Sequence, residues 1–309
     1  MTARSSRITG WGTALPDKIL TNADLEGMLD TSDAWIVERS GIRERRIGGS
    51  TAGLATDAGR AAMAKARVTD VDLVLVATCS PDQVMPAAAC TVQHALGLRC
   101  GALDINAACS GFVYGLVVGH QMIAGGMNRV LLIGSETMSR LIDWDDRTTA
   151  VLFGDGAGAV VLEATEGGGG GLLGYDLGSD GSVRHILEAD IGGFIRMEGR
   201  EVFRRAVRVM IDSSRTAMAM AGVDADQIAL CVPHQANVRI IESALGKIGI
   251  PMERTAMVLE RTGNTSAASV PLALADAVDA GRLSPGDLVL LTGFGAGMTW
   301  ASAVIRWSP

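Results

Sequence analysis

The sequence predicts an α/β protein built from two related halves, with helices covering both faces of mixed, mostly parallel sheets. Apolar strand-like segments alternate with amphipathic helical segments, and segments of the second half repeat those of the first in the same order. The composition agrees with this class. Of the 309 residues, 48% are hydrophobic but only 4% are aromatic, so small aliphatic side chains must fill a close-packed core.

The elements of the first half follow from hydrophobic periodicity. Two short helices are expected at 22–30 and 31–40, with Thr31, Ser32 and Asp33 forming an N-cap for the second. The expected elements that follow are an Ala-rich helix at 51–67, a buried strand at 71–77, a helix at 87–96, a strand at 101–105, a long apolar helix at 110–122, and strands at 130–133 and 159–162.

The second half repeats this order. Residues 223–230 match 68–75, and residues 287–293 echo 129–134, each pair containing a buried strand. A helix is expected at 201–221. A run of five glycines at 167–171 predicts a flexible surface loop, and we divide the chain there into an N-terminal half, 1–166, and a C-terminal half, 167–309.

The repeat places three polar residues near one another. Cys109 and Asn264 stand at similar distances before the last strand of their halves, so they are expected to open corresponding helices. If the halves pack about a pseudo-twofold axis, both helix N-termini meet near it. His234 ends the strand equivalent to the one ending at Thr78, on the same rim, where active sites of α/β sheets lie.

Composition also limits the class of function. A net charge of −7 argues against general nucleic-acid binding. No stretch reaches the ~18 uninterrupted apolar residues of a membrane span, and the N-terminus has no apolar signal core. The five cysteines are odd in number and lack CxxC spacing, which favours a reduced, cytoplasmic protein without a metal site.

Cys109 is the candidate nucleophile. A thiol at the first turn of a helix lies near unpaired backbone N–H groups and the positive end of the helix dipole, which favour the thiolate. Such a thiolate can attack a thioester reversibly and hold the acyl group. A buried structural role is commoner for any one cysteine, and we expect it for Cys90, Cys100 and Cys231.

His234 and Asn264 suggest a second chemical step. A neutral imidazole Nε2–H and an Asn amide can donate to one oxygen and stabilise the enolate formed when a malonyl thioester loses CO2. Considered alone, His234 is more often a structural residue whose hydrogen bonds are satisfied, and Asn264 could simply cap its helix. The glycine-rich stretch 292–297 could place backbone N–H groups beside Cys109 or form an ordinary turn. The stretch 153–158 is no dinucleotide fingerprint, because a strand follows it.

These motifs resemble those of the β-ketoacyl-acyl carrier protein synthases of the third type, the initiating condensing enzymes of bacterial fatty acid synthesis. The resemblance covers nearly the whole chain and is carried by residues 21–26, 30–37, 41–45, 153–158, 232–237 and 263–270. It implies a thiolase-like fold with a layered α/β/α/β/α core, a homodimer, no cofactor or metal, and two substrates, acyl-CoA and malonyl-acyl carrier protein.

The resemblance also assigns roles. Cys109 would accept the acyl group, and His234 and Asn264 would promote decarboxylation. The backbone N–H groups of Cys109 and Ala296 would form the oxyanion hole beside Phe294 as gate. The remaining implied roles are CoA binding by Trp35, Arg39, Arg147, Phe203 and Asn237, and carrier-protein docking by Arg204, Arg239 and Lys247.

The chain departs from the family pattern at three places, one that the oxyanion hole should tolerate and two that concern the primer. Ala296 stands where Gly is frequent, and Met85 replaces a Phe that the partner subunit donates to the floor of the acyl pocket. The loop between Gly178 and Phe194 is shorter than in familiar members.

Several alternatives stay open to different degrees. A degradative thiolase needs a second cysteine in the last glycine-rich loop, and residues 293–297 contain none. Plant-type polyketide synthases are longer chains. A priming ketosynthase of a specialised pathway, a simple acyltransferase and an inactive carrier-binding relative are the other candidates, but the presence of Cys109, His234 and Asn264 favours condensation.

Overall fold

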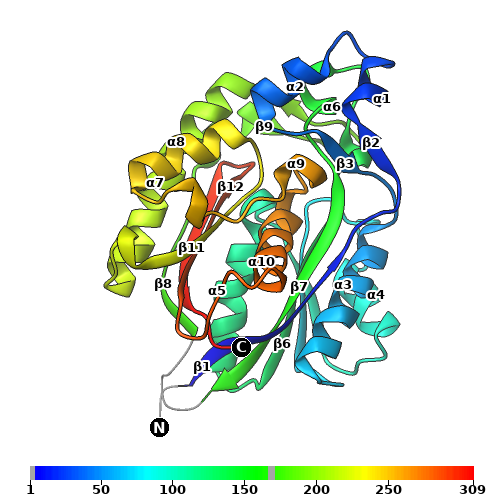
Figure 1. Ribbon diagram of the computed structural model, residues 1–309. Coiled ribbons are helices and arrows are strands. Elements are labelled where there is room, and N and C mark those ends of the chain that lie inside the picture. Colours follow the sequence, from blue (N-terminus) through cyan, green and yellow to red (C-terminus); the bar gives the residue numbers. More distant parts are fainter. Residues whose placement is uncertain (1–3, 166–170) are drawn as a thin grey trace.

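Two twisted sheets face each other in the computed structural model, which describes residues 4–165 and 171–309 (Figure 1). The first sheet has the strand order β1-β7-β6-β4-β5, and the second has the order β11-β12-β13-β8. The strands are β1 (Ser5–Ala14), β4 (Leu73–Ala77), β5 (Gly101–Ile105), β6 (Arg129–Thr137), β7 (Asp155–Thr165), β8 (Gly171–Ser179), β11 (Ile228–Pro233), β12 (Leu288–Gly295) and β13 (Thr299–Arg306).

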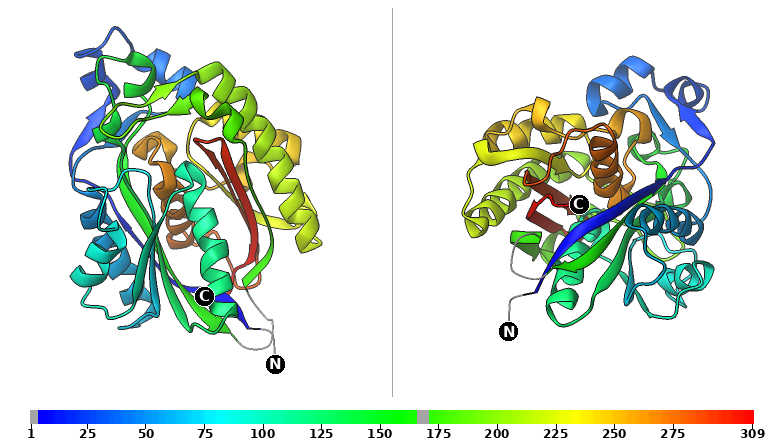
Figure 2. Two further views of the ribbon diagram at one scale, coloured as in Figure 1. Left: turned by 180° about the vertical axis from the view of Figure 1, so that it is seen from behind. Right: turned by 60° about the horizontal axis from the view of Figure 1, so that its bottom comes forward.

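Helices form three layers around these sheets, as Figure 2 shows from two further directions. Helices α5 (Gly111–Ala124) and α10 (Ser269–Asp279) lie between the sheets and contact both. Helices α3 (Thr51–Ala66) and α4 (Ala88–Ala95) cover the outer face of the first sheet, and α7 (Gly199–Ala221) and α8 (Val238–Ile248) cover that of the second. The expected α/β/α/β/α layering is therefore confirmed.

The internal repeat is visible in the topology of the sheets. In the first, β4 runs parallel to β6, which pairs antiparallel with β7, which pairs antiparallel with β1. In the second, β11, β12, β13 and β8 follow the same sequence of parallel and antiparallel pairings. Strand β5 has no full counterpart, since only an isolated parallel bridge between Cys231 and Thr255 takes its place.

One apolar core joins the two sheets across the central helices. It includes Phe112 on α5, Leu274 on α10, Leu132 on β6 and Leu291 on β12, all with fully buried side chains. Truncating a side chain such as Phe112 to alanine would cost about 3–5 kcal/mol by lost burial and a residual cavity. Both sheets therefore hold α5 and α10 in place, and this sets the positions of the polar residues at the N-termini of these two helices.

Shorter elements surround one end of the layers: β2 (Ile19–Thr21), α1 (Asn22–Glu26), α2 (Asp33–Ser40), β3 (Glu44–Arg46), α6 (Arg147–Ala150), β9 (Leu187–Glu188), β10 (Arg196–Met197) and α9 (Leu259–Thr262). The expected cap is confirmed, because the Ser32 side chain accepts from the Trp35 N–H at 3.2 Å. The expected helix at 22–30 ends four residues early, at Glu26.

The proposed division of the chain falls on residues 166–170, which lie outside the described residues together with most of the glycine run, so this boundary stays a prediction. Gly171 begins β8. Among the described residues, no helix combines the length and hydropathy that a bilayer crossing requires.

Candidate active site

Cys109 lies deep between the two halves. It follows β5 in a 3-10 turn, η1 (Ala108–Ser110), that leads into α5, and its side chain is only 7% exposed. The backbone of β12 closes over it, since a Cβ added at Gly295 would lie 2.5 Å from the Cys109 nitrogen. Only glycine permits this approach, which explains one position of the glycine-rich stretch at 292–297.

Burial opposes the thiolate that the helix N-terminus favours at Cys109. It raises the pKa of the Cys109 thiol to about 12, and the Ser266 side chain only partly offsets that effect. The helix N-terminus is present as predicted, and the loss of water around a buried anion acts against it. Acylation at neutral pH therefore requires a group that takes the thiol proton.

The other four cysteines are also free. Cys231 is buried, as expected for a structural cysteine, whereas Cys100 is half-buried. Cys90 is exposed, contrary to the prediction, because its side of α4 faces solvent.

His234 follows β11 and is 1% exposed. Its Nδ1 lies 2.7 Å from the Ser269 hydroxyl, which accepts the Gln235 N–H at 3.3 Å. With that N–H donating to it, the hydroxyl can give its own proton to Nδ1, which leaves Nε2 as the protonated nitrogen of a neutral ring. Burial lowers the pKa of His234 to about 3, so the ring stays neutral at physiological pH.

Asn264 precedes η6 (Ser266–Ala268), the turn that opens α10. Its Oδ1 accepts the Ser266 N–H at 2.8 Å, while its backbone bridges to Phe153. Within 4–165 and 171–309, its Nδ2 donates to no protein atom, so this N–H group is available to a ligand. Asn264 therefore acts as a turn residue ahead of η6 and keeps a free donor, and its catalytic role stays a prediction.

The three candidate residues meet in one cavity of about 630 Å³, which Cys109, His234, Asn264 and Phe294 line together. The Phe294 ring packs edge-on against His234 with ring centres 5.4 Å apart. The structure therefore brings together residues that lie far apart in the sequence. Cys109 can act as nucleophile there, and two N–H donors converge near it.

Four of the five residues expected to bind CoA line this cavity, and the fifth, Arg147, contacts one of them, Trp35. Arg39, Phe203 and Asn237 line the cavity together with Arg239. The guanidinium groups of Arg39 and Arg147 each lie 5.0 Å from the centre of the Trp35 ring, a cation–π arrangement.

Both polar ends of the Asn237 side chain are already engaged. Its Nδ2 donates to the Arg39 carbonyl at 2.8 Å, and its Oδ1 accepts the Arg239 N–H at 2.9 Å as the N-cap of α8. Asn237 therefore fixes the cavity wall by joining α2 to α8.

Cys109 also lines a second cavity of about 420 Å³ on its other side. Ala296 lines this cavity, whose wall has an apolar part, formed by Met138, Leu141, Phe153, Leu187 and Ile195, and a charged part, formed by Arg184, Glu188 and Asp190. Met85 lines neither cavity and is 81% exposed, so within one chain it lies outside the site.

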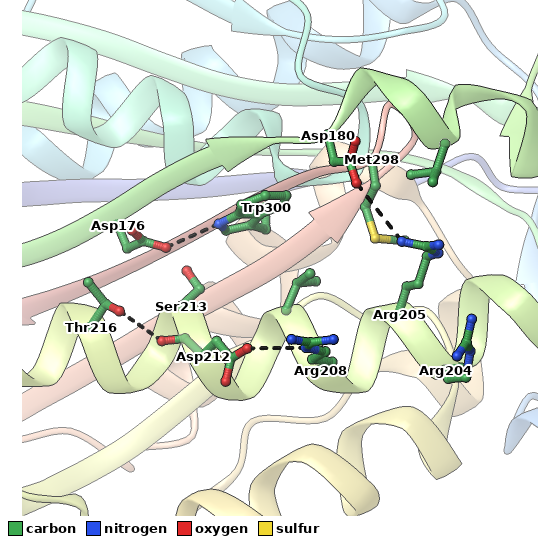
Figure 3. A pocket seen from close by; sticks show the side chains of 12 residues that line it. Asp176, Asp180, Arg204, Arg205, Arg208, Asp212, Ser213, Thr216, Met298 and Trp300 are labelled. Atoms are coloured by element: carbon green, nitrogen blue, oxygen red, sulfur yellow. Dashed lines mark hydrogen bonds and ion pairs between the residues drawn. The ribbon is translucent and has the colours of Figure 1, made fainter.

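Two of the residues expected to dock a carrier protein lie apart from the Cys109 cavity. Lys247 is exposed in the last turn of α8. Arg204 is exposed, pairs with Glu201 at 2.8 Å, and lines a separate groove of about 600 Å³ beside α7 (Figure 3). In that groove Arg205 faces Asp180 and Arg208 faces Asp212, so the charges largely balance, and neither a cysteine nor a histidine lines it.

Two buried polar residues and one half-buried cysteine near Cys109 escaped the sequence reasoning. Glu136 at the end of β6 is fully buried, Cys79 follows β4, and Ser266 lies in η6. The signal for Glu136 was an acidic residue three positions after the apolar run 130–133. Its partners come from two distant segments, 78–80 and 266–267, so no local pattern identified them.

Comparison with known proteins agrees with this geometry. Models of the 3-oxoacyl-(acyl-carrier-protein) synthase III family match residues 103–181 and, for the C-terminal part, 218–307. A protein of Roseiflexus castenholzii named beta-ketoacyl-(acyl-carrier-protein) synthase III is 50% identical, with 99% of each chain covered.

Two solved structures extend the comparison. The crystal structure of 3-oxoacyl-(acyl-carrier-protein) synthase III from Aquifex aeolicus superposes with a TM-score of 0.95 at 43% identity, covering 98% of this chain and all of that one. The priming beta-ketosynthase of the R1128 polyketide pathway superposes with a TM-score of 0.93 at 33% identity, covering 99% and 97%. The chain belongs to the 3-oxoacyl-(acyl-carrier-protein) synthase III family, and its fold is thiolase-like.

Proposed function

We propose that this enzyme joins an acyl-CoA primer to malonyl-acyl carrier protein by decarboxylative Claisen condensation, through an acyl-Cys109 intermediate, and so initiates fatty acid synthesis. The observation that carries this proposal is the single cavity lined by Cys109, His234 and Asn264, in which His234 is a neutral N–H donor. The N-terminal half, 1–166, supplies the nucleophile, and the C-terminal half, 167–309, supplies both donors.

In the first step the Cys109 sulfur attacks the thioester carbonyl of acyl-CoA, and CoA leaves. The negative charge on the carbonyl oxygen is stabilised by the backbone N–H groups of Cys109 and Ala296. The position of Ala296 beside Cys109 in the second cavity supports this role, and replacing Gly by Ala there keeps the N–H. The acyl chain then occupies the apolar wall of that cavity.

In the second step malonyl-acyl carrier protein replaces CoA in the first cavity. The Nε2–H of His234 and the Nδ2–H of Asn264 donate to the thioester oxygen while CO2 leaves, and the resulting carbanion attacks acyl-Cys109. The products are β-ketoacyl-acyl carrier protein, CO2 and free CoA. These steps balance with the chain's own groups, so we propose no cofactor and no metal.

The CoA would lie in the outer part of the first cavity. Trp35 and Arg147 would clamp the adenine ring, which fits the stacked guanidinium groups on Trp35. Arg39 and Phe203 would contact the rest of CoA, and Asn237 would hold the wall in shape.

An acidic carrier protein would dock at exposed positive charges on α7 and α8, one of them at the mouth of this cavity. Arg239 lines the mouth, Arg204 lies along α7, and Lys247 lies at the end of α8. Opposite charges of this kind mainly accelerate encounter and set orientation.

We further propose a homodimer built through β5. This strand is the unpaired edge of the five-stranded sheet, and Leu103 on it is 39% exposed. Val84 and Met85 shortly precede α4, the helix that packs against β5, and they are 76% and 81% exposed. Pairing of two β5 edges would bury this surface and bring the partner subunit's Met85 to the second cavity. Free cysteines throughout fit a cytoplasmic enzyme.

Fatty acid initiation is favoured over a priming ketosynthase of a polyketide pathway. The chain is 50% identical to the Roseiflexus synthase III but 33% identical to the R1128 priming ketosynthase. The two functions differ in the starter group that the enzyme accepts.

Intact-protein mass spectrometry tests the proposal. The enzyme and Cys109→Ala would be mixed with acetyl-, isobutyryl-, hexanoyl- and dodecanoyl-CoA, and an increase of one acyl group on the native chain alone is expected. His234→Ala and Asn264→Ala should still form the adduct but fail to release CO2 from malonyl-acyl carrier protein. Loss of acylation with retained decarboxylation in both variants would refute the assigned roles.

A further inference from the structure

Directly beside Cys109 lies a buried carboxylate that the steps above do not use. Glu136 is 0% exposed, and its Oε1 accepts the Ser266 hydroxyl at 2.9 Å and the Cys79 thiol at 3.3 Å. Its Oε2 accepts the hydroxyl groups of Thr78 at 2.9 Å and Ser80 at 2.5 Å. Hydroxyls, a thiol and backbone N–H groups therefore surround this carboxylate on every side.

Within residues 4–165 and 171–309, no cation contacts Glu136. The nearby Arg140 binds the Ser80 carbonyl and Asp82 instead, and Asp155 on the neighbouring strand binds Ser139 and the Gly48 N–H. The titratable groups that face Glu136 are the thiols of Cys79 and Cys109. A buried carboxylate without a counter-charge is costly, so a function in the site would explain its presence.

Ser266 connects this carboxylate to the nucleophile. Its hydroxyl donates to Glu136 at 2.9 Å, lies 3.6 Å from the Cys79 sulfur and lowers the pKa of the Cys109 thiol, and both Ser266 and Cys109 line the second cavity. Its backbone has φ +48°, a left-handed conformation that is strained for a residue with a Cβ. Ala108 has a similar φ of +47°, so this conformation belongs to the turn, and the contact with Glu136 is what points to a use for the Ser266 hydroxyl.

We propose that Glu136, acting through the Ser266 hydroxyl, accepts the proton that Cys109 loses when it attacks acyl-CoA. This inference rests on the proposed function. As the sulfur lone pair forms the new C–S bond, the thiol proton moves to Ser266 Oγ and the Ser266 proton moves to Glu136 Oε1. When the C–S bond to CoA breaks, the same hydroxyl returns a proton to the departing CoA sulfur, so no net proton is gained or lost.

The competing base is His234, and its chemistry is less suitable. Burial lowers the pKa of His234 to about 3, whereas burial raises the pKa of Glu136 above its ordinary value, so Glu136 holds a proton better. The charge of Glu136 itself raises the pKa of the Cys109 thiol. Transfer of the proton from Cys109 to Glu136 leaves one negative charge at the site at any time, so a thiolate and a carboxylate never repel each other there.

The test is the pH dependence of single-turnover acylation by acetyl-CoA, followed by quenching and intact-protein mass spectrometry. For the wild type we expect a rate that is flat from pH 7 to 9. Ser266→Gly, which removes the hydroxyl and relaxes the positive φ, should lower the rate at pH 7 by about 100-fold. Its rate should then rise about tenfold per pH unit, because a free thiolate must form first.

Further variants separate a proton path from a structural role. Ser266→Ala should behave like Ser266→Gly, and Glu136→Gln should show the same slope if it folds. Ser135→Ala is the control, because Ser135 lies next to Glu136 on β6 and its buried hydroxyl donates to the Thr51 carbonyl. This variant should keep the flat pH profile of the wild type. Decarboxylation of malonyl-acyl carrier protein is measured in parallel, because that half-reaction involves no thiol proton.

A flat profile in both Ser266 variants, or an equal loss of both half-reactions without a change of slope, would overturn the inference and leave the proposed function intact. Absence of any acyl adduct on the wild type would overturn the proposed function, and this inference with it.

Discussion

The neutral state of His234 makes a quantitative prediction about stability in acid. The ring is 1% exposed and its pKa is lowered from 6.5 to about 3 by burial. In the unfolded chain the same imidazole titrates near 6.5. Between these two pH values the unfolded state binds more protons than the folded state, so this residue makes the protein less stable as the pH falls.

The size of the effect follows from the shift. At pH 5 the imidazole is 1.5 units below its unfolded pKa, and at about 1.4 kcal/mol per unit this removes about 2 kcal/mol of stability relative to pH 8. Near pH 3 the loss would approach about 5 kcal/mol. Above pH 6.5 the contribution is constant.

Urea unfolding of the wild type and His234→Gln at pH 8 and pH 5, at one fixed protein concentration, measures this contribution as a double difference. We expect the free energy of unfolding of the wild type to fall by about 2 kcal/mol more than that of the variant. His94→Gln changes an exposed histidine on α4 and should leave the wild-type pH dependence unchanged. A double difference below about 0.5 kcal/mol would mean that His234 titrates normally, and the assignment of a permanently neutral donor would be refuted.

Three further predictions concern the two cavities and the docking surface. Gly295→Ala should cut single-turnover acylation by about 100-fold with unchanged far-UV circular dichroism, because its Cβ would lie 2.5 Å from the Cys109 nitrogen; acylation within threefold of the wild type would contradict this. Ile195→Trp should narrow the second cavity, so that the dodecanoyl adduct falls more than tenfold relative to the acetyl adduct; equal loss of both would show that Ile195 does not set chain length. Lys247→Glu should raise KM for malonyl-acyl carrier protein about fivefold at low salt and less at high salt, with KM for acyl-CoA as the internal control; a change without salt dependence would argue against electrostatic docking.

The sequence was sufficient for the architecture because the relevant signals are local. The order of strands and helices follows from hydrophobic periodicity over short windows, and the repeat follows from matching turns such as 68–75 and 223–230. The site residues were found for a related reason. Cys109 and His234 stand at ends of buried elements, where polar residues in an otherwise apolar context are conspicuous.

The electrostatics of the site could not be predicted in this way. Whether Cys109 is a thiol or a thiolate depends on how completely β12 and η6 cover it, and those segments lie more than a hundred residues away. The tautomer of His234 depends on Ser269, whose side chain could equally have capped α10. Met85 shows a further limit, because the role proposed for it in a partner subunit would leave no trace in the cavities of its own chain.

The pseudo-symmetry explains why the site needs both halves. Asn106 Oδ1 accepts the Ala108 N–H at 3.1 Å just as Asn264 Oδ1 accepts the Ser266 N–H, and Ala108 and Ser266 have φ values of +47° and +48°. The counterpart of Asn264 is therefore Asn106, and Cys109 stands three residues later, opposite Ala267.

The same comparison applies to the strand ends. Ala77 pairs with Gly134 as Pro233 pairs with Thr292, so His234 corresponds to Thr78. The two pairs are Cys109 with Ala267, and His234 with Thr78. In each pair the second residue has no proposed chemical role: Ala267 has no functional group, and Thr78 donates to Glu136. One backbone geometry thus serves twice, and the first half retains the nucleophile and its buried carboxylate while the second retains the two N–H donors and the Ser266 hydroxyl. Neither half alone contains a complete set for acylation or for decarboxylative condensation.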